Sequence, residues 1–139
     1  MEALTVQTII KAPIEKVWKC WTTPADIIQW NNPSEDWETT SVAVDLKDNG
    51  KFIYKMKAKN GSVAFDFTGT YDKIIINEYI ESTLFDHRKV INIFKPNGDE
   101  TILIETFEPE TETPIPEQKA FTQAVIDNFK KYVEEILTH

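Results

Sequence analysis

The sequence has few of the residues that mark several classes of protein. It contains one cysteine, Cys20, which excludes an internal disulfide and leads us to expect the reducing cytoplasm. Of the fifteen basic residues only Arg88 is an arginine, and 23 acidic residues bring the net charge to −8. This balance lacks the clustered positive charge that nucleic acids and anionic membranes attract. We therefore expect neither nucleic acid nor membrane as a partner.

Long hydrophobic runs are also missing. No apolar run exceeds a few residues, so no segment is long enough to span a bilayer. No basic start followed by an apolar stretch marks a signal peptide. With 139 residues, 41% of them hydrophobic and 27% charged, the chain is predicted to form one globular domain over residues 1–139.

Glycine is scarce, and its placement predicts turns. A two-residue turn at Asn60-Gly61 places Tyr54 opposite Phe67 and separates an apolar face from a charged one. A three-residue loop that ends at Gly50 would place Leu46 opposite Phe52. Three of the four glycines follow an asparagine, which is the strongest short signal for a hairpin: Asn49-Gly50, Asn60-Gly61 and Asn97-Gly98.

The last predicted hairpin has two candidate core faces. A two-residue turn at Asn97-Gly98 places Val90 opposite Glu105. Periodicity alone favours the isoleucine face as the core. The first face carries Ile91, Ile93, Ile102 and Ile104, and the second carries Arg88, Val90, Asn92, Phe94, Thr101, Leu103 and Glu105.

Helical spacing of apolar residues predicts three helices. Two short ones follow Pro13 and Thr23, with Thr23 as an N-cap, and a helix of about 20 residues runs from Glu117 onward. Between Lys95 and Lys119 every charged residue is acidic, which predicts a solvated connection outside any cavity. The fold class is therefore α+β, with six to seven antiparallel strands that bury one face against the long helix.

Short sequence words, in a fixed order along the whole chain, carry a resemblance. They are Ala12-Pro13-x-x-x-Val17-Trp18, Trp21-Thr22-x-Pro24, Gln29-Trp30-Asn31, Asp36-Trp37, Asp45-Leu46-x-x-x-Gly50-x-Phe52, Met56-x-Ala58-x-x-Gly61-Ser62, Phe65-Asp66-Phe67-x-Gly69-x-Tyr71, Arg88-x-Val90-x-x-x-Phe94, Thr101-x-x-x-Glu105-Thr106-Phe107-x-x-Glu110 and Asn128-Phe129-Lys130-Lys131-Tyr132. The order of elements resembles the helix-grip (SRPBCC) superfamily of START domains and birch-pollen allergens. The words are similar to proteins related to the C-terminal domain of the activator of the heat-shock-protein-90 ATPase.

This resemblance implies both a fold and a function. It implies a curved sheet wrapped around the C-terminal helix, with the face of Arg88, Asn92 and Glu105 inside and the isoleucines outside. Relatives hold lipids, sterols or polyketide-like molecules between sheet and helix, and a few catalyse cyclisation or dehydration. The resemblance thus implies a small hydrophobic ligand, with a chaperone partner or self-association through the isoleucine face as an alternative.

Arg88 and Glu105 form the sharpest candidate pair on the inner face. In the predicted register they lie diagonally on one face, within reach of long side chains. A guanidinium can hold a buried carboxylate in a bidentate pair. The pair is either a structural salt bridge or a polar anchor for a ligand, with Asn92 as a further hydrogen-bonding group, and in an enzyme Glu105 would act with Arg88 or Asn92.

Aromatic residues supply the rest of the predicted site, either as ordinary core or as cavity walls. Trp37 is different because it falls in a polar stretch that core periodicity does not explain, so we expect it to cover one end of a cavity. The predicted wall residues are Trp30, Trp37, Tyr54, Phe65, Phe67, Tyr71, Phe121 and Val125.

Other chemistry has little support in the sequence. His87 and His139 have no partners at metal-ligand spacing, and His87 is predicted to lie in a solvent-facing turn. Cys20 has no histidine partner and is predicted to be a buried structural thiol. No glycine-rich phosphate loop occurs, so neither a metal nor a cofactor is predicted.

Overall fold

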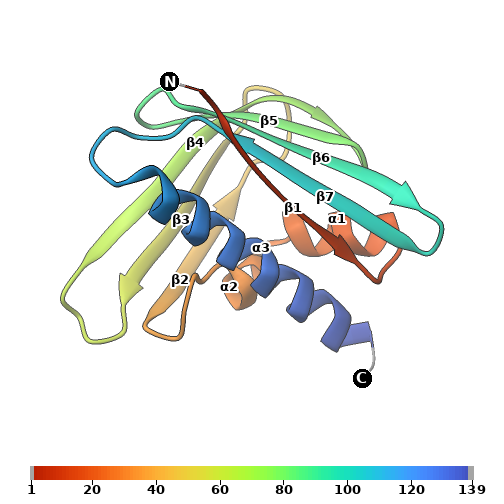
Figure 1. Ribbon diagram of the computed structural model, residues 1–139, viewed down its shortest axis with the longest axis horizontal. Helices are drawn as coiled ribbons and strands as arrows, with labels where there is room; N and C mark the ends of the chain where they lie inside the picture. Colours follow the sequence, from red (N-terminus) through yellow and green to blue (C-terminus); the bar gives the residue numbers. More distant parts are fainter. Residues whose placement is uncertain (1, 138–139) are drawn as a thin grey trace.

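The computed structural model describes residues 2–137 and shows an antiparallel sheet curled around one long helix (Figure 1). The sheet order is β1-β7-β6-β5-β4-β3-β2. This arrangement confirms the predicted α+β helix-grip fold. The elements are β1 (Leu4–Ile10), α1 (Ile14–Thr22), α2 (Pro24–Trp30), β2 (Trp37–Val44), β3 (Lys51–Ala58), β4 (Ala64–Ile75), β5 (Tyr79–Leu84), β6 (Lys89–Asn97), β7 (Glu100–Phe107) and α3 (Ile115–Leu137).

The core lies under the C-terminal half of α3, where α1 and α2 pack against it (Figure 1). Trp30 of α2 stacks on Trp21 of α1, with ring centroids 4.7 Å apart. Phe129 of α3 packs edge-on against Trp21 and Trp30, at 4.9 Å and 4.8 Å. Both short helices fill this half of the concave face, and a cavity lies under the N-terminal half of α3.

The two short helices begin where the prolines predict. Pro13 directly precedes α1, and Pro24 is the first residue of α2, where its missing N–H costs no hydrogen bond. Thr23 occupies the predicted N-cap position of α2, although its side chain makes no capping hydrogen bond. The start of α2 is held instead by backbone bonds from Asp26 and Ile27 to the Thr23 carbonyl.

The hairpin of β3 and β4 has the predicted register. Tyr54 pairs with Phe67, Lys55 with Asp66, and the turn contains Gly61 with a φ of 78°. The alternation of apolar and charged residues is therefore sufficient to fix this pairing.

The predicted register of β2 and β3 is wrong by two residues. Phe52 pairs with Val44, not with Leu46, because the connection between the strands is longer than three residues. Part of that connection pairs with β4 instead, since Asn49 N–H donates to the Tyr71 carbonyl at 2.7 Å and Tyr71 N–H donates to the Gly50 carbonyl at 2.8 Å.

The predicted register of β6 and β7 is also wrong by two residues, because Asn92, and not Val90, pairs with Glu105. Asn97 pairs with Glu100, so the two-residue loop is Gly98-Asp99. Gly98 has a φ of 63°, and the first loop position is where a type II′ hairpin takes a glycine.

The inner face of this hairpin is the one that the family resemblance implies. Its strand residues Asn92, Phe94, Thr101 and Leu103 are buried, whereas the isoleucines on the opposite face are partly exposed. The preference that periodicity alone gave to the isoleucine face is wrong, because the polar residues of the inner face have hydrogen-bond partners: Thr101, for example, donates to the Ala12 carbonyl at 2.8 Å.

The helix α3 begins at Ile115, two residues before the predicted start at Glu117. Pro116 is tolerated because the first turn of a helix leaves its N–H groups unpaired in any case. The Pro114 carbonyl accepts hydrogen bonds from Glu117 and Gln118 N–H. Across residues 2–137, none of the helices is both long and apolar enough to cross a membrane.

Candidate functional site

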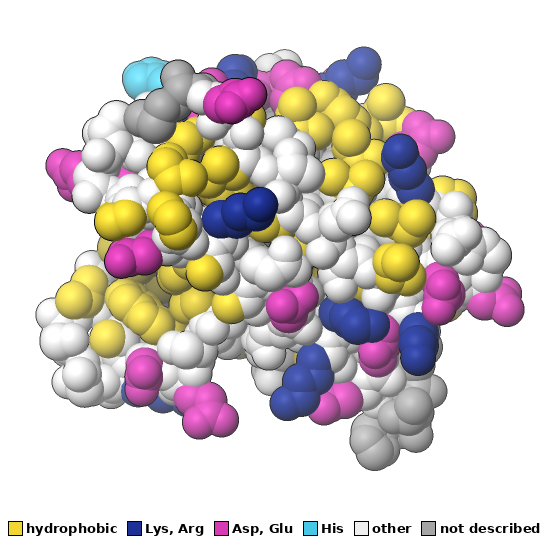
Figure 2. All heavy atoms as spheres, viewed as in Figure 1, with side chains coloured by type: hydrophobic (Ala, Val, Ile, Leu, Met, Phe, Trp, Pro, Cys, Tyr) yellow, Lys and Arg dark blue, Asp and Glu magenta, His cyan; other side chains and the backbone are white. Residues whose placement is uncertain are grey.

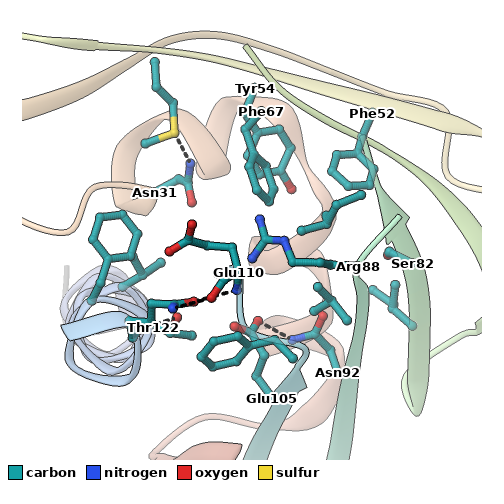
Figure 3. A pocket seen from close by; sticks show the side chains of 18 of the residues that line it. Asn31, Phe52, Tyr54, Phe67, Ser82, Arg88, Asn92, Glu105, Glu110 and Thr122 are labelled. Carbon is teal, nitrogen blue, oxygen red and sulfur yellow. Dashed lines mark hydrogen bonds between the residues drawn. The ribbon is translucent and has the colours of Figure 1, made fainter. Parts of the chain in front are cut away.

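A cavity of about 620 Å³ lies between the concave face of the sheet and the N-terminal half of α3 (Figure 3). It occupies the space that α1 and α2 leave unfilled. Its walls come from β3, β4, β5, β6 and β7, from the ends of α1 and α2, from α3 and from the segment that precedes α3. The lining comprises Trp21, Trp30, Asn31, Phe52, Tyr54, Met56, Phe65, Phe67, Tyr71, Ile80, Ser82, Leu84, Arg88, Val90, Asn92, Glu105, Phe107, Glu110, Thr113, Glu117, Gln118, Phe121, Thr122 and Val125.

Aromatic rings from β3 and β4 form one wall. Phe52 lies 5.5 Å from Tyr54, 6.0 Å from Phe67 and 5.0 Å from Tyr71, measured between ring centroids. These residues share one face because they alternate along paired strands. Burial raises the pKa of Tyr71 and of Tyr54 far above the ordinary phenol range, so both hydroxyls stay protonated.

The cavity opens to solvent beside the first turns of α3. Phe65 and Phe121 line it and are 41% and 49% exposed, values that are high for phenylalanine. Figure 2 shows a hollow with hydrophobic side chains on this part of the surface, where Figure 1 places β3, β4 and the start of α3. A ligand would therefore meet aromatic side chains at the opening.

Glu105 and Asn92 place a polar pair on the inner surface of the cavity. Asn92 Nδ2 donates to Glu105 Oε1 at 2.7 Å, and the two residues are direct partners across β6 and β7. Burial raises the pKa of Glu105, and the hydrogen bond from Asn92 opposes that shift in part. None of the ion pairs among residues 2–137 involves Glu105.

Arg88 lines the cavity, but the predicted pair with Glu105 is wrong. Arg88 Nε donates to Asp86 Oδ2 at 2.6 Å, and Nη1 donates to the Glu108 carbonyl at 3.4 Å. The physical reason is the register of β6 and β7. Glu105 pairs with Asn92 instead of Val90, which places it two residues further along β6 from Arg88 than predicted. Figure 3 shows the guanidinium extending toward Glu110.

The segment of residues 108–114, which we call the strap, closes one side of the cavity. Gln118 holds it: its Oε1 accepts from Glu110 N–H at 2.9 Å, and its Nε2 donates to the carbonyls of Glu110 and Thr113 at 3.0 and 2.7 Å. Hydrogen bonds from Thr113 and Glu112, with a smaller effect of the Arg88 charge, lower the pKa of Glu110. Glu110 and Glu117 line the cavity, so the prediction that the acidic connection lies outside it is wrong.

All predicted site residues except Trp37 line the cavity: Trp30, Tyr54, Phe65, Phe67, Tyr71, Arg88, Asn92, Glu105, Phe121 and Val125. Trp37 is the first residue of β2 and packs edge-on against Phe65, with centroids 5.8 Å apart. It supports a wall residue from outside the cavity, so the expectation that it covers one end is wrong. The reason is that Trp37 begins β2 instead of lying in a polar loop.

Sequence reasoning missed Gln118, Thr122 and the strap residue Glu110. Gln118 and Thr122 are four residues apart on one face of α3, so helical spacing from Phe121 and Val125 would have located them. The strap carries no periodic signal, because side-chain hydrogen bonds to its backbone determine its shape.

The other candidate residues lie outside the cavity lining. His87 is exposed in the turn between β5 and β6, with a φ of 71°, and Cys20 is a fully buried thiol. His139 lies outside the described residues. Within residues 2–137 no three His, Cys, Asp or Glu side chains gather in a way that could hold a metal ion.

Replacing Glu105 with glutamine is expected to raise the free energy of unfolding at pH 7 by about 0.5–2 kcal/mol. The raised pKa means that folding favours the protonated form, so the wild type loses stability as pH rises through the pKa of the folded state. The gain should shrink as pH falls toward 4.5, the ordinary value for Glu. Urea unfolding of wild type, Glu105→Gln and the exposed control Glu35→Gln at several pH values measures this, and an equal gain in both variants contradicts it.

Comparisons with known proteins agree with the fold. The chain matches the family model described as "Activator of Hsp90 ATPase homolog 1-like protein" over residues 11–137. No curated protein matches the sequence.

Solved structures include two with substantial identity. The AHSA1-like protein from Aeromonas hydrophila is 37% identical, with a TM-score of 0.92 and coverage of 99% of this chain and 96% of that one. Chr148 from Cytophaga hutchinsonii is 43% identical, with a TM-score of 0.83 and coverage of 97% and 94%. NE0264 from Nitrosomonas europaea shares the fold, with a TM-score of 0.83 at 16% identity. The match covers 99% of this chain and 97% of that one. The chain therefore belongs to the family of activator of Hsp90 ATPase homolog 1-like proteins, within the helix-grip superfamily.

Proposed function

We propose that the protein binds a small hydrophobic or amphipathic molecule in the cavity between the sheet and α3. The observation that supports this proposal is the cavity itself, which is lined by aromatic rings and by a few convergent polar groups. Ligand sites in proteins combine these two features, and their volumes run from about 300 to 1,000 Å³. The cavity volume of about 620 Å³ falls within that range.

The size of the cavity also sets the expected affinity. A ligand of about 20 non-hydrogen atoms at about −0.3 kcal/mol per atom gains about −6 kcal/mol, which corresponds to a dissociation constant of tens of micromolar. Binding should therefore be measured at protein and ligand concentrations near 100 µM, where weak complexes are populated.

A variant that fills the cavity tests the proposal. Thr122 of α3 faces the cavity (Figure 3), so Thr122→Trp places an indole in the ligand space. Amide NMR shifts are recorded against a panel of lipids, sterols and flavonoids for wild type, Thr122→Trp and the control Lys131→Trp, which adds the same ring at an exposed position of α3. We expect shifts clustered at lining residues, with affinity about tenfold weaker in Thr122→Trp and unchanged in Lys131→Trp.

Two outcomes would contradict this function. One is a panel that produces no clustered shifts in the wild-type protein. The other is an equal loss of binding in both tryptophan variants, which would place the ligand elsewhere. Thermal unfolding of both variants shows whether each is folded.

Glu105 supports a second candidate function, acid–base catalysis of the cyclase or dehydratase kind. It is a carboxylate with a raised pKa facing a cavity, which is a common property of catalytic acids and bases. A positioned acid or base contributes about 10²–10⁴-fold to a rate. Mass spectrometry of panel ligands after incubation tests this candidate: a product formed by wild type and lost in Glu105→Gln supports it, and unchanged ligands contradict it.

A protein-binding role would use the outer sheet face instead. Ile93 and Ile104 are direct partners there, as are Ile9 and Ile102 in the adjacent strand pair, and of these four residues only Ile9, at 49%, is strongly exposed. We favour the cavity for this reason. Light scattering that shows a stable oligomer, or a complex with an added Hsp90-type chaperone, would instead support the outer face.

A further inference from the structure

The charged groups around the cavity are unequal in number and in pairing. The lining contains one basic residue, Arg88, and three acidic ones, Glu105, Glu110 and Glu117. The positive charge of Arg88 is already matched by Asp86, whose Oδ2 lies 2.6 Å from Arg88 Nε. The cavity therefore offers an anionic ligand no uncompensated cation among its described lining residues.

Glu105 is the opposite case. Its carboxylate lies on the inner surface of the cavity and takes one hydrogen bond from a neutral amide, that of Asn92 at 2.7 Å. No ion pair among residues 2–137 includes it. A half-buried carboxylate that lines a cavity without a cationic partner is costly, and a cation that enters the site reduces that cost.

The aromatic wall suits a cation as well as an apolar body. Rings of Tyr54, Phe67 and Tyr71 line the same space as Glu105, and the Glu105 charge is close enough to contribute, after burial and Tyr71, to raising the pKa of Tyr54. The faces of aromatic rings attract ammonium groups, most strongly where water is excluded. Hydrogen bonds between a charged donor and a carboxylate are about twice as strong as neutral ones.

We propose that the ligand is an amphipathic amine, with its ammonium group bound to the Glu105 carboxylate and its apolar part against the aromatic wall. The inference rests on the proposed binding function, because it names the class of molecule that the cavity takes. It reverses the role that the sequence suggests for Arg88. The guanidinium donates to Asp86 and to the carbonyl of Glu108 in the strap, and Glu105 is the anchor for the polar end of the ligand.

Three probes of one shape separate the alternatives: 1-pyrenemethylamine, 1-pyrenemethanol and 1-pyrenecarboxylic acid. They carry a positive, a neutral and a negative polar end on the same apolar ring system. Titrations at pH 7 and 150 mM salt follow the quenching of tryptophan fluorescence, since Trp21 and Trp30 line the cavity. In the wild-type protein we expect the amine to bind about tenfold more tightly than the alcohol, and the acid to bind most weakly.

Charge variants locate the origin of that preference. Glu105→Gln should bring the amine and the alcohol to the same dissociation constant, because the carboxylate is gone while the shape of the side chain is kept. Glu35→Gln removes one negative charge from an exposed site outside the cavity and should leave the tenfold ratio intact. Amide NMR spectra of both variants confirm that they are folded.

The outcomes distinguish this inference from the function on which it rests. Equal binding of all three probes, strongest binding of the acid, or a preference for the amine that survives in Glu105→Gln overturns the amine assignment and leaves the binding function standing. Loss of the preference in Glu35→Gln as well assigns it to the overall charge of −8 and also overturns the inference. If none of the probes binds, the cavity is not a site for molecules of this size, and both proposals fail.

Discussion

Replacing Trp30 with alanine is expected to lower the free energy of unfolding by about 3–5 kcal/mol. Trp30 is 2% exposed, stacks on Trp21 and meets the ring of Phe129. Its Nε1 also donates to the Cys20 carbonyl at 2.9 Å. Truncation would leave a void where α1, α2 and α3 meet and would remove that hydrogen bond.

Trp37→Ala is the matched control, because Trp37 is a half-buried tryptophan at the start of β2 with one aromatic neighbour, Phe65. Its expected cost is about 1 kcal/mol. Urea unfolding followed by far-UV circular dichroism measures both variants. Trp30→Phe, which keeps a ring but loses the bond to Cys20, provides an intermediate value if the alanine variant does not fold. Equal costs for the two alanine variants would mean that the three-helix contact is not the centre of the core.

Gly50→Ala is expected to cost about 3 kcal/mol of stability. A Cβ atom at this position would lie 1.9 Å from the Asp45 carbonyl oxygen and 3.0 Å from that of Lys47. Both oxygens belong to the backbone of the same connection, so relief of the clash requires the β2–β3 loop to change shape. That change would also disturb the pairing of the loop with Tyr71 of β4.

Gly61→Ala separates the effect of the clash from that of the backbone conformation. Gly61 has a φ of 78°, but a Cβ atom there meets nothing within 4 Å. Only the penalty for a left-handed residue remains, about 1–2 kcal/mol. Thermal and urea unfolding of both variants should therefore rank Gly50→Ala as the more damaging, and the reverse order would contradict the close approach at Asp45.

Sequence patterns separated the two faces of each strand better than they predicted strand pairing, although for β6 and β7 it was the family resemblance, and not periodicity, that identified the buried face. The β3–β4 hairpin was predicted to the residue, because a shift by one would mix charged and apolar side chains. The other two hairpins were displaced by two residues, and a displacement by two leaves every side chain on its face. Periodicity does not detect such a shift, and only the backbone of the loops decides it.

The same distinction explains the candidate site. The aromatic walls were predicted because they depend on faces alone, and Tyr54, Phe67 and Tyr71 line the cavity in any even register. The partner of Glu105 depends on strand pairing. The predicted register therefore gave Arg88 as its partner, whereas the observed partner is Asn92. The strap was beyond prediction, since the Gln118 side chain shapes it through contacts with backbone atoms.

The hydrogen bonds of Gln118 bear on how quickly a bound molecule would exchange with solvent. Passage on the strap side would require the three bonds between Gln118 and the strap to break together. On the other side, none of the described hydrogen bonds joins α3 to β3 or β4, and the route is bordered by the exposed rings of Phe65 and Phe121. Exposed side chains change rotamer within nanoseconds, so molecules would enter and leave past these rings while the backbone remains in place.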